Sequence, residues 1–226
     1  MGYRKELKEK SVEGTEQRFD IIDSRFVFPT KLDLILEENT DLYSIQSFTV
    51  KGSDGVEYYR CSYNLNTIIV YSMYGEPLCN IEDSQMTFKN KQTIYRGTSK
   101  DVLSTVKAKD STVGFKFVVE FTNLSSEKTE LFDMNCDIQY RACGIFYGKE
   151  KSGAPMVCKI LKNCYYASLF KIEIAPGIDS AFMVALSLLF MKRSVKNRQG
   201  PAGNVFYSFL YINNILLVII LIIYIE

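Results

Sequence analysis

The sequence predicts an antiparallel β-barrel of about twelve strands that encloses one hydrophobic helix near the C-terminus. From Phe26 onward, short segments alternate apolar and polar residues and are separated by turn residues, which is typical of half-buried strands. Residues 178–193 are apolar on nearly every face, so protein or lipid must enclose them. Because a barrel of about twelve strands is too wide for its own side chains to fill, we expect the helix to fill it.

The composition excludes several classes of site. The chain has 226 residues, no histidine, and six cysteines without a C-x-x-C pair. The usual general base and zinc ligand is therefore missing, and we expect neither an enzyme nor a bound metal or cofactor. A formal net charge of +1 argues against nucleic-acid binding through a basic surface. The cysteines are expected to be reduced, which is typical of the cytosol or nucleus.

A charged N-terminal segment precedes the predicted strands. Residues 1–24 carry mixed charge and few large apolar groups, so we expect a flexible segment. The barrel is predicted over residues 25–196. Its strands are predicted at residues 31–37, 47–51, 56–62, 67–71, 77–83, 91–96, 102–109, 114–121, 131–140, 143–149, 156–162 and 168–175. The clearest alternation lies in 131–140, where the apolar side chains from Phe132 to Tyr140 share one face.

The central helix is predicted over residues 178–193. Pro176 and Gly177 end the preceding strand, and Asp179 or Ser180 can cap the first turn, since a carboxylate or hydroxyl accepts from its free N–H groups. Lys192 and Arg193 suit the negative end of the helix. The continuous apolar part is about half as long as a membrane span requires, so we expect a buried core helix.

A second apolar run follows a predicted linker at residues 197–204. Residues 205–225 are long enough to cross a bilayer as a helix, and basic residues precede them. Three interpretations stay open for the tail 205–226: a membrane anchor, an additional packed or interfacial segment, and translated non-coding sequence. An anchor would hold the barrel at the cytoplasmic face of a membrane; otherwise we expect a cytosolic or nuclear protein.

Two stretches carry a family resemblance. Residues 95–107 read YRGTSKDVLSTVK and residues 175–186 read APGIDSAFMVAL. On these stretches the chain resembles the LURP-one-related family, a mainly plant group. The resemblance implies a twelve-stranded barrel around a C-terminal helix, as in phospholipid scramblases and the tubby C-terminal domain, and suggests a role in plant defence or signalling. Scramblases carry an acidic calcium-loop candidate before this helix, whereas residues 174–179 hold one acid, Asp179.

A group of cations within neighbouring hairpins forms the candidate site. Tubby domains hold phosphoinositide headgroups with basic residues on the barrel wall, so the resemblance implies an anionic membrane lipid as partner. The candidate headgroup ligands are Lys89, Lys91, Arg96, Lys100, Lys107, Lys109 and Lys116. In the sequence, the nearby acids that oppose them are Asp101 and Asp110. The alternative for these cations is an ordinary solvated strand face. The alternative functions are a protein-interaction or transcription-linked adaptor without lipid binding and, third, a phospholipid scramblase.

Overall fold

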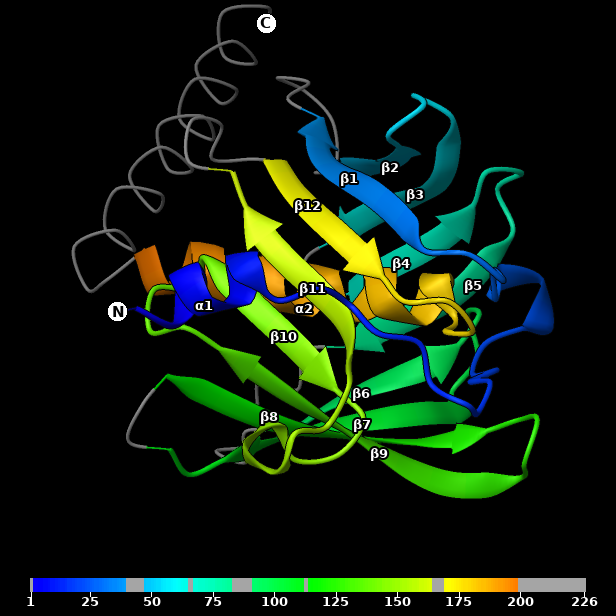
Figure 1. The fold of residues 1–226 in the computed structure, drawn as a ribbon. Coiled ribbons are helices and arrows are strands. Elements are labelled where there is room, and N and C mark those ends of the chain that lie inside the picture. Colours follow the sequence, from blue (N-terminus) through cyan, green and yellow to red (C-terminus); the bar gives the residue numbers. More distant parts are fainter. Residues whose placement is uncertain are drawn as a thin grey trace, which may run out of the picture.

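The computed structural model describes residues 2–39, 47–64, 67–82, 91–111, 114–163 and 169–198. In this part of the chain, twelve antiparallel strands form a closed barrel in which each strand pairs with its neighbours in sequence and β1 pairs with β12 (Figure 1). The strands are β1 Leu32–Asn39, β2 Ser47–Gly52, β3 Glu57–Asn64, β4 Thr67–Ser72, β5 Pro77–Glu82, β6 Lys91–Arg96, β7 Val102–Lys109, β8 Phe115–Asn123, β9 Lys128–Cys136, β10 Ala142–Phe146, β11 Met156–Lys162 and β12 Leu169–Ile174. The predicted fold class is confirmed.

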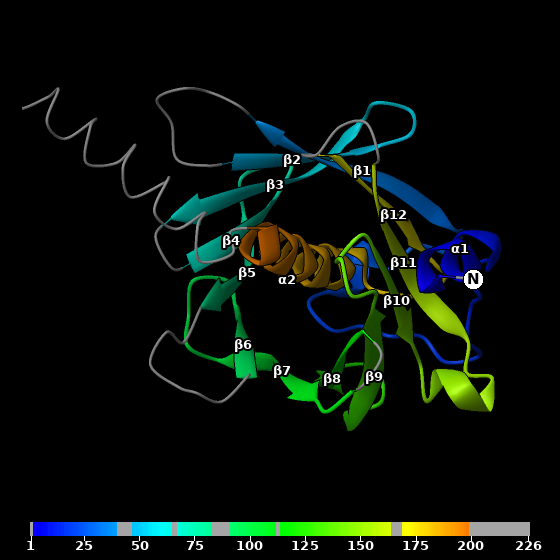
Figure 2. The ribbon, with the colours of Figure 1, turned by 90° about the vertical axis from the view of Figure 1, so that its left-hand side faces the viewer.

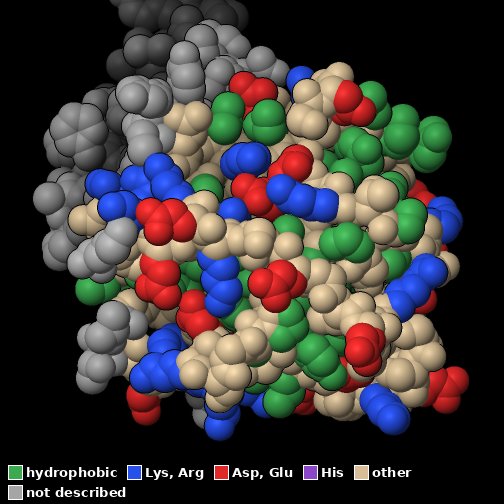
Figure 3. All heavy atoms as spheres, viewed as in Figure 1, with side chains coloured by type: hydrophobic (Ala, Val, Ile, Leu, Met, Phe, Trp, Pro, Cys, Tyr) green, Lys and Arg blue, Asp and Glu red, His purple; other side chains and the backbone are tan. Residues whose placement is uncertain are grey.

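The strand alternation determines which side chains face the inside of the barrel. In β2, Phe48 and Val50 are buried whereas Thr49 and Lys51 remain partly exposed. Successive side chains of a strand point to opposite faces. Because most of the other strands also alternate buried apolar residues with more exposed ones, their buried side chains form a continuous apolar inner surface. On the outer face that carries β1, β11 and β12, Lys and Arg side chains are interspersed with Asp and Glu (Figure 3).

The helix α2, Ser180–Arg198, runs inside the ring of strands (Figure 2). Every residue from Ala181 to Leu189 is at most 1% exposed, which confirms the predicted core helix. It begins two residues later than predicted and continues beyond residue 193. The buried hydroxyl of Ser187 donates to the carbonyl of Met183 at 2.8 Å, so this polar side chain costs little inside the apolar core.

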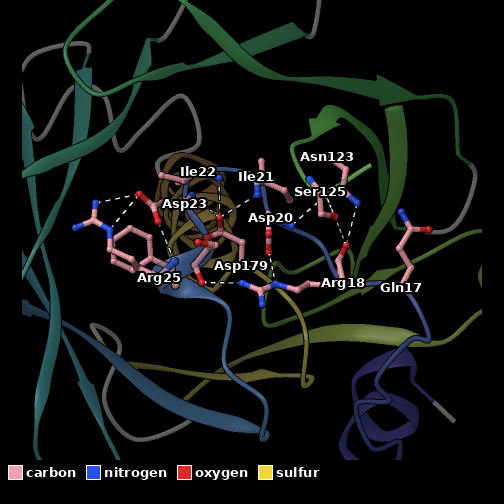
Figure 4. A network of polar contacts seen from close by, with 12 residues as sticks. Gln17, Arg18, Asp20, Ile21, Ile22, Asp23, Arg25, Asn123, Ser125 and Asp179 are labelled. Atoms are coloured by element: carbon pink, nitrogen blue, oxygen red, sulfur yellow. Dashed lines mark hydrogen bonds and ion pairs between the residues drawn. The ribbon is translucent and has the colours of Figure 1, made fainter. Parts of the chain in front are cut away.

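Asp179 anchors the start of α2 (Figure 4). Its Oδ1 accepts from the N–H of Phe182 at 3.0 Å, and its Oδ2 accepts from three successive N–H groups of the N-terminal segment. The three donors to Oδ2 are Ile21 at 3.1 Å, Ile22 at 2.6 Å and Asp23 at 3.3 Å. Burial raises the pKa of this carboxyl to about 6, although the four hydrogen bonds oppose the shift. Of the two predicted caps, Asp179 is therefore the one that accepts from the first turn.

The N-terminal segment packs on the barrel, which differs from the flexible segment predicted for residues 1–24. The helix α1, Tyr3–Glu9, lies beside β10 outside the ring (Figure 1), and its fully buried Leu7 packs with Phe146 and Met156. Farther along, Phe19 and Ile21 are fully buried in the main core. Charge dominates the composition of this segment, but a few apolar residues at the right positions suffice to dock it.

The predicted strand 131–140 ends early, because β9 stops at Cys136. The carboxylate of Asp137 accepts from the N–H groups of Arg141 at 2.6 Å and Ala142 at 2.8 Å, which folds the chain into a turn. Tyr140 has a left-handed φ of 49°, so strand geometry cannot continue through it. The alternation in the sequence continues into this turn, but Ile138 is 63% exposed and is not part of the core.

The predicted tail 205–226 lies outside the described residues, as do residues 199–204 of the predicted linker. The first two linker residues belong to α2. Among the helices that are described, none combines the length and the apolar character required to cross a membrane.

Candidate anion-binding pocket

Three of the seven predicted headgroup ligands pair with carboxylates from nearby strands. Three lysines on the outer wall form ion pairs: Lys100 with Glu82, Lys107 with Glu120 at 3.3 Å, and Lys109 with Asp133 at 2.8 Å. The expectation that Asp101 and Asp110 would be the opposing acids is therefore wrong, because strand pairing brings in acids from distant parts of the sequence. Exposed pairs of this kind contribute about 0–1 kcal/mol each and leave little net positive charge for a ligand.

Two further predicted ligands, Arg96 and Lys91, do not form a shared site in the described part of the chain either. The guanidinium of Arg96 donates to the carbonyl of Ile22 at 3.0 Å, and so helps to hold the N-terminal segment on the barrel. Lys91 lies directly across from Lys107 on the paired strands β6 and β7. Lys89 lies outside the described residues.

The remaining predicted ligand, Lys116, lines a pocket of about 900 Å³ that the sequence does not indicate. The pocket lies between α1, the start of β8, the turn that follows β9, and the short 3₁₀ helix η2, Glu150–Ser152. Its cationic lining residues are Arg4, Lys10, Lys116, Arg141 and Lys151. Its carboxylates are Glu6, Asp137 and Glu150. A volume of this size suits a small-molecule ligand or a lipid headgroup.

Neutral donors already engage two of the three carboxylates. Glu150 accepts from the hydroxyl of Tyr3 at 3.0 Å and from the side-chain amide of Asn135 at 2.8 Å. Burial, and secondly the charge of Glu150, raise the pKa of Tyr3, which keeps the phenol protonated as a donor. Asp137 accepts the two backbone N–H groups that shape its turn. These two acids thus have structural partners, and neither is tied to a lining cation by an ion pair within the described residues.

Three of the lining cations have no carboxylate partner among the residues that the structure describes. Within the described ranges, no ion pair involves Lys116, Arg141 or Lys151. Lys116 is half-buried, and the other two are exposed at the rim. Cations that line one cleft without neutralising partners raise the local concentration of anions, and the planar fork of arginine suits a phosphate or carboxylate. The pocket therefore has the chemistry of an anion-binding site.

Gly114 shapes the wall of this pocket. Its φ is +70°, a left-handed backbone conformation that residues other than glycine rarely adopt. A Cβ at this position would lie 2.3 Å from the carbonyl oxygen of Cys136, which is closer than any real contact. The close approach fixes the start of β8 against the end of β9, and so places Lys116 beside the turn that carries Arg141.

Comparisons with known proteins agree with the fold. The family described as LURP-one-related matches residues 32–191, from the start of β1 into α2. A protein of Arabidopsis thaliana, solved by X-ray crystallography, superimposes with a TM-score of 0.55 and 16% sequence identity. The superposition covers 75% of this chain and 95% of that one. No curated protein matches the chain.

Proposed function

The chain belongs to the LURP-one-related family, and we propose that it is a non-enzymatic binding barrel that associates with anionic membrane lipid through its pocket cations. The single observation that carries the proposal is the convergence of Lys116, Arg141 and Lys151 on one pocket, with no ion pair for any of them in the described parts of the chain. A role in plant defence or signalling would use this association.

Simple electrostatics indicates the affinity to expect. Each cation near an anionic bilayer contributes about 1 kcal/mol, so the three cations together would contribute roughly 3 kcal/mol. This is enough for reversible recruitment and is sensitive to salt, because the Debye length shortens as ionic strength rises. The paired lysines of β6 to β8 would contribute less, since each would first have to exchange its own carboxylate for the lipid.

The fold supports the proposal by analogy, since tubby domains hold phosphoinositides with basic residues on the same kind of barrel. Calcium-triggered lipid translocation receives less support. The acid nearest to the start of the helix, Asp179, is fully buried and accepts four backbone N–H groups, so its oxygens are already engaged. Among the described residues, no cluster of three or more Cys, Asp or Glu side chains could hold a metal ion.

Vesicle sedimentation of the full chain tests the proposal. The arms are neutral phosphatidylcholine vesicles, vesicles that also contain phosphatidylserine, and vesicles that contain a phosphoinositide at matched total charge, each across a sodium chloride series. We expect binding to both anionic vesicles, none to neutral vesicles, and progressive loss as salt rises. Stronger binding to the phosphoinositide arm would identify a phosphorylated headgroup as the preferred ligand.

Two outcomes would contradict the proposal. One is sedimentation that does not depend on lipid charge or salt. The other is no sedimentation at all together with a stoichiometric protein partner in a pull-down, which would favour the alternative function of a protein-binding adaptor.

A further inference from the structure

Two thiols face each other across the strands that border the pocket. The sulfur atoms of Cys136 on β9 and Cys143 on β10 lie 3.3 Å apart, and the two residues are directly opposite in register. The N–H of the next residue, Asp137, donates to the carbonyl of Ala142 at 3.0 Å. Hydrogen-bonded and non-hydrogen-bonded pairs alternate along an antiparallel ladder, so the cysteine pair occupies a non-hydrogen-bonded position, where facing side chains are closest.

This geometry is close to that of a disulfide. A disulfide bond requires the two sulfur atoms to approach to about 2.05 Å with Cβ atoms about 3.5–4.5 Å apart. Facing residues at a non-hydrogen-bonded position have Cβ atoms at about this separation without movement of the strands. Rotation of the two side chains therefore suffices to bring the sulfur atoms into bonding distance.

The two thiols differ slightly in burial. Cys136 is 3% exposed and Cys143 is fully buried, and both belong to the main apolar core inside the barrel. Burial raises the pKa of the Cys143 thiol well above its ordinary value, which keeps this thiol protonated. Cys136 is therefore the less buried thiol, and the one that a small oxidant meets first.

We propose that Cys136 and Cys143 are a modification site that forms an intramolecular disulfide when hydrogen peroxide reaches the pair. The Cys136 thiolate attacks the O–O bond of hydrogen peroxide, which yields a sulfenic acid and releases one water once the leaving hydroxide takes a proton. The sulfur of Cys143 then displaces the hydroxyl of the sulfenic acid, which leaves as a second water with the Cys143 proton. Two thiols are oxidised to one disulfide, and one peroxide is reduced to two waters.

Peptide mapping of the full chain tests this assignment. Reduced protein is freed of reductant, exposed to hydrogen peroxide, quenched with acid, unfolded, alkylated and digested with trypsin. We expect peptides 129–141 and 142–149 to be recovered as one linked species that is lighter by two hydrogen atoms than the two separate peptides, and dithiothreitol to release them. Cys61 and Cys79, which are buried thiols at other positions in the barrel, should stay alkylatable under the same treatment.

Single substitutions test whether the linked species depends on this pair and not on another cysteine. Cys143→Ser should abolish the linked species and leave Cys136 as a sulfenic acid that dimedone traps, whereas Cys158→Ala should leave the linked species unchanged. Thermal melts of the reduced proteins verify that each variant is folded. The proposal is overturned if wild-type Cys136 and Cys143 stay as alkylatable as Cys61 and Cys79 after peroxide, or if Cys136 links to a different cysteine.

Discussion

Replacing Ala185 with aspartate should abolish the cooperative unfolding transition of the domain. Ala185 lies in the enclosed part of α2 and is 0% exposed, with β-strands around the helix on all sides. An unpaired carboxylate at this position costs several kcal/mol, because it leaves water without gaining a partner. That cost is comparable to the whole free energy of unfolding of a typical domain, which is about 5–15 kcal/mol. Circular dichroism during thermal or urea denaturation measures the effect.

The same substitution at an exposed position serves as the control. Ala108 is an exposed residue of β7, so Ala108→Asp introduces the same carboxylate in water and should preserve the transition. A cooperative melt of Ala185→Asp at nearly the wild-type temperature would mean that the helix is not enclosed by the barrel.

Replacing Asp179 with asparagine should lower the free energy of unfolding by several kcal/mol at acid pH, where the contribution of this carboxyl group is largest. The carboxyl group accepts four backbone N–H groups, three of which belong to residues 21–23 of the N-terminal segment. The amide group of asparagine has one oxygen, and its NH₂ group would face donors, so at least one buried N–H loses its acceptor. Each such loss costs about 1–3 kcal/mol, and the amide donors add repulsion. Urea denaturation measures the difference, with the exposed Asp110→Asn as the control.

The cost of this substitution should also depend on pH. Burial raises the pKa of Asp179 from 3.8 to about 6 in the folded protein, so the folded state binds this proton more tightly than the unfolded state does. The contribution of the carboxyl to stability is therefore fully present below pH 3.8 and is lost as the pH rises through about 6. The difference in unfolding free energy between wild type and Asp179→Asn should fall over this range by on the order of 3 kcal/mol. A difference that is constant with pH, or that grows as the pH rises, would contradict this account.

The sequence predicted the fold well because two strong physical signals agree. The alternation over residues 91–96 and 102–109 reproduces β6 and β7, since one face of each strand must be apolar to meet the core. The helix α2 could be identified because a helical segment without a polar face must be surrounded by protein or lipid. The packing of α1 was missed because Leu7 is a single apolar residue within a charged segment. The early end of β9 was missed because alternation cannot reveal that the Asp137 side chain forms a turn.

The candidate site was predictable in part. Closeness in sequence favoured the lysines of β6 to β8, yet it could not show that Glu120 on β8 and Asp133 on β9 would neutralise two of them. Of the predicted ligands, Lys116 reaches the pocket. Its companions are Arg141, from the turn after β9, and Lys151, from the short helix η2. No spacing rule connects them to Lys116 before the strands are paired.

Vesicle binding by two matched triple variants tests most directly whether the pocket cations carry the function. One variant changes the pocket residues (Lys116→Gln, Arg141→Gln, Lys151→Gln), and the other changes the paired wall residues (Lys100→Gln, Lys107→Gln, Lys109→Gln), so that both lose the same net charge. Thermal melts verify that both are folded. The pocket variant should lose affinity for anionic vesicles by on the order of a hundredfold, as expected from three cations at about 1 kcal/mol each, and the wall variant should lose much less. Equal losses in the two variants, or a larger loss in the wall variant, would contradict the assignment of lipid binding to the pocket.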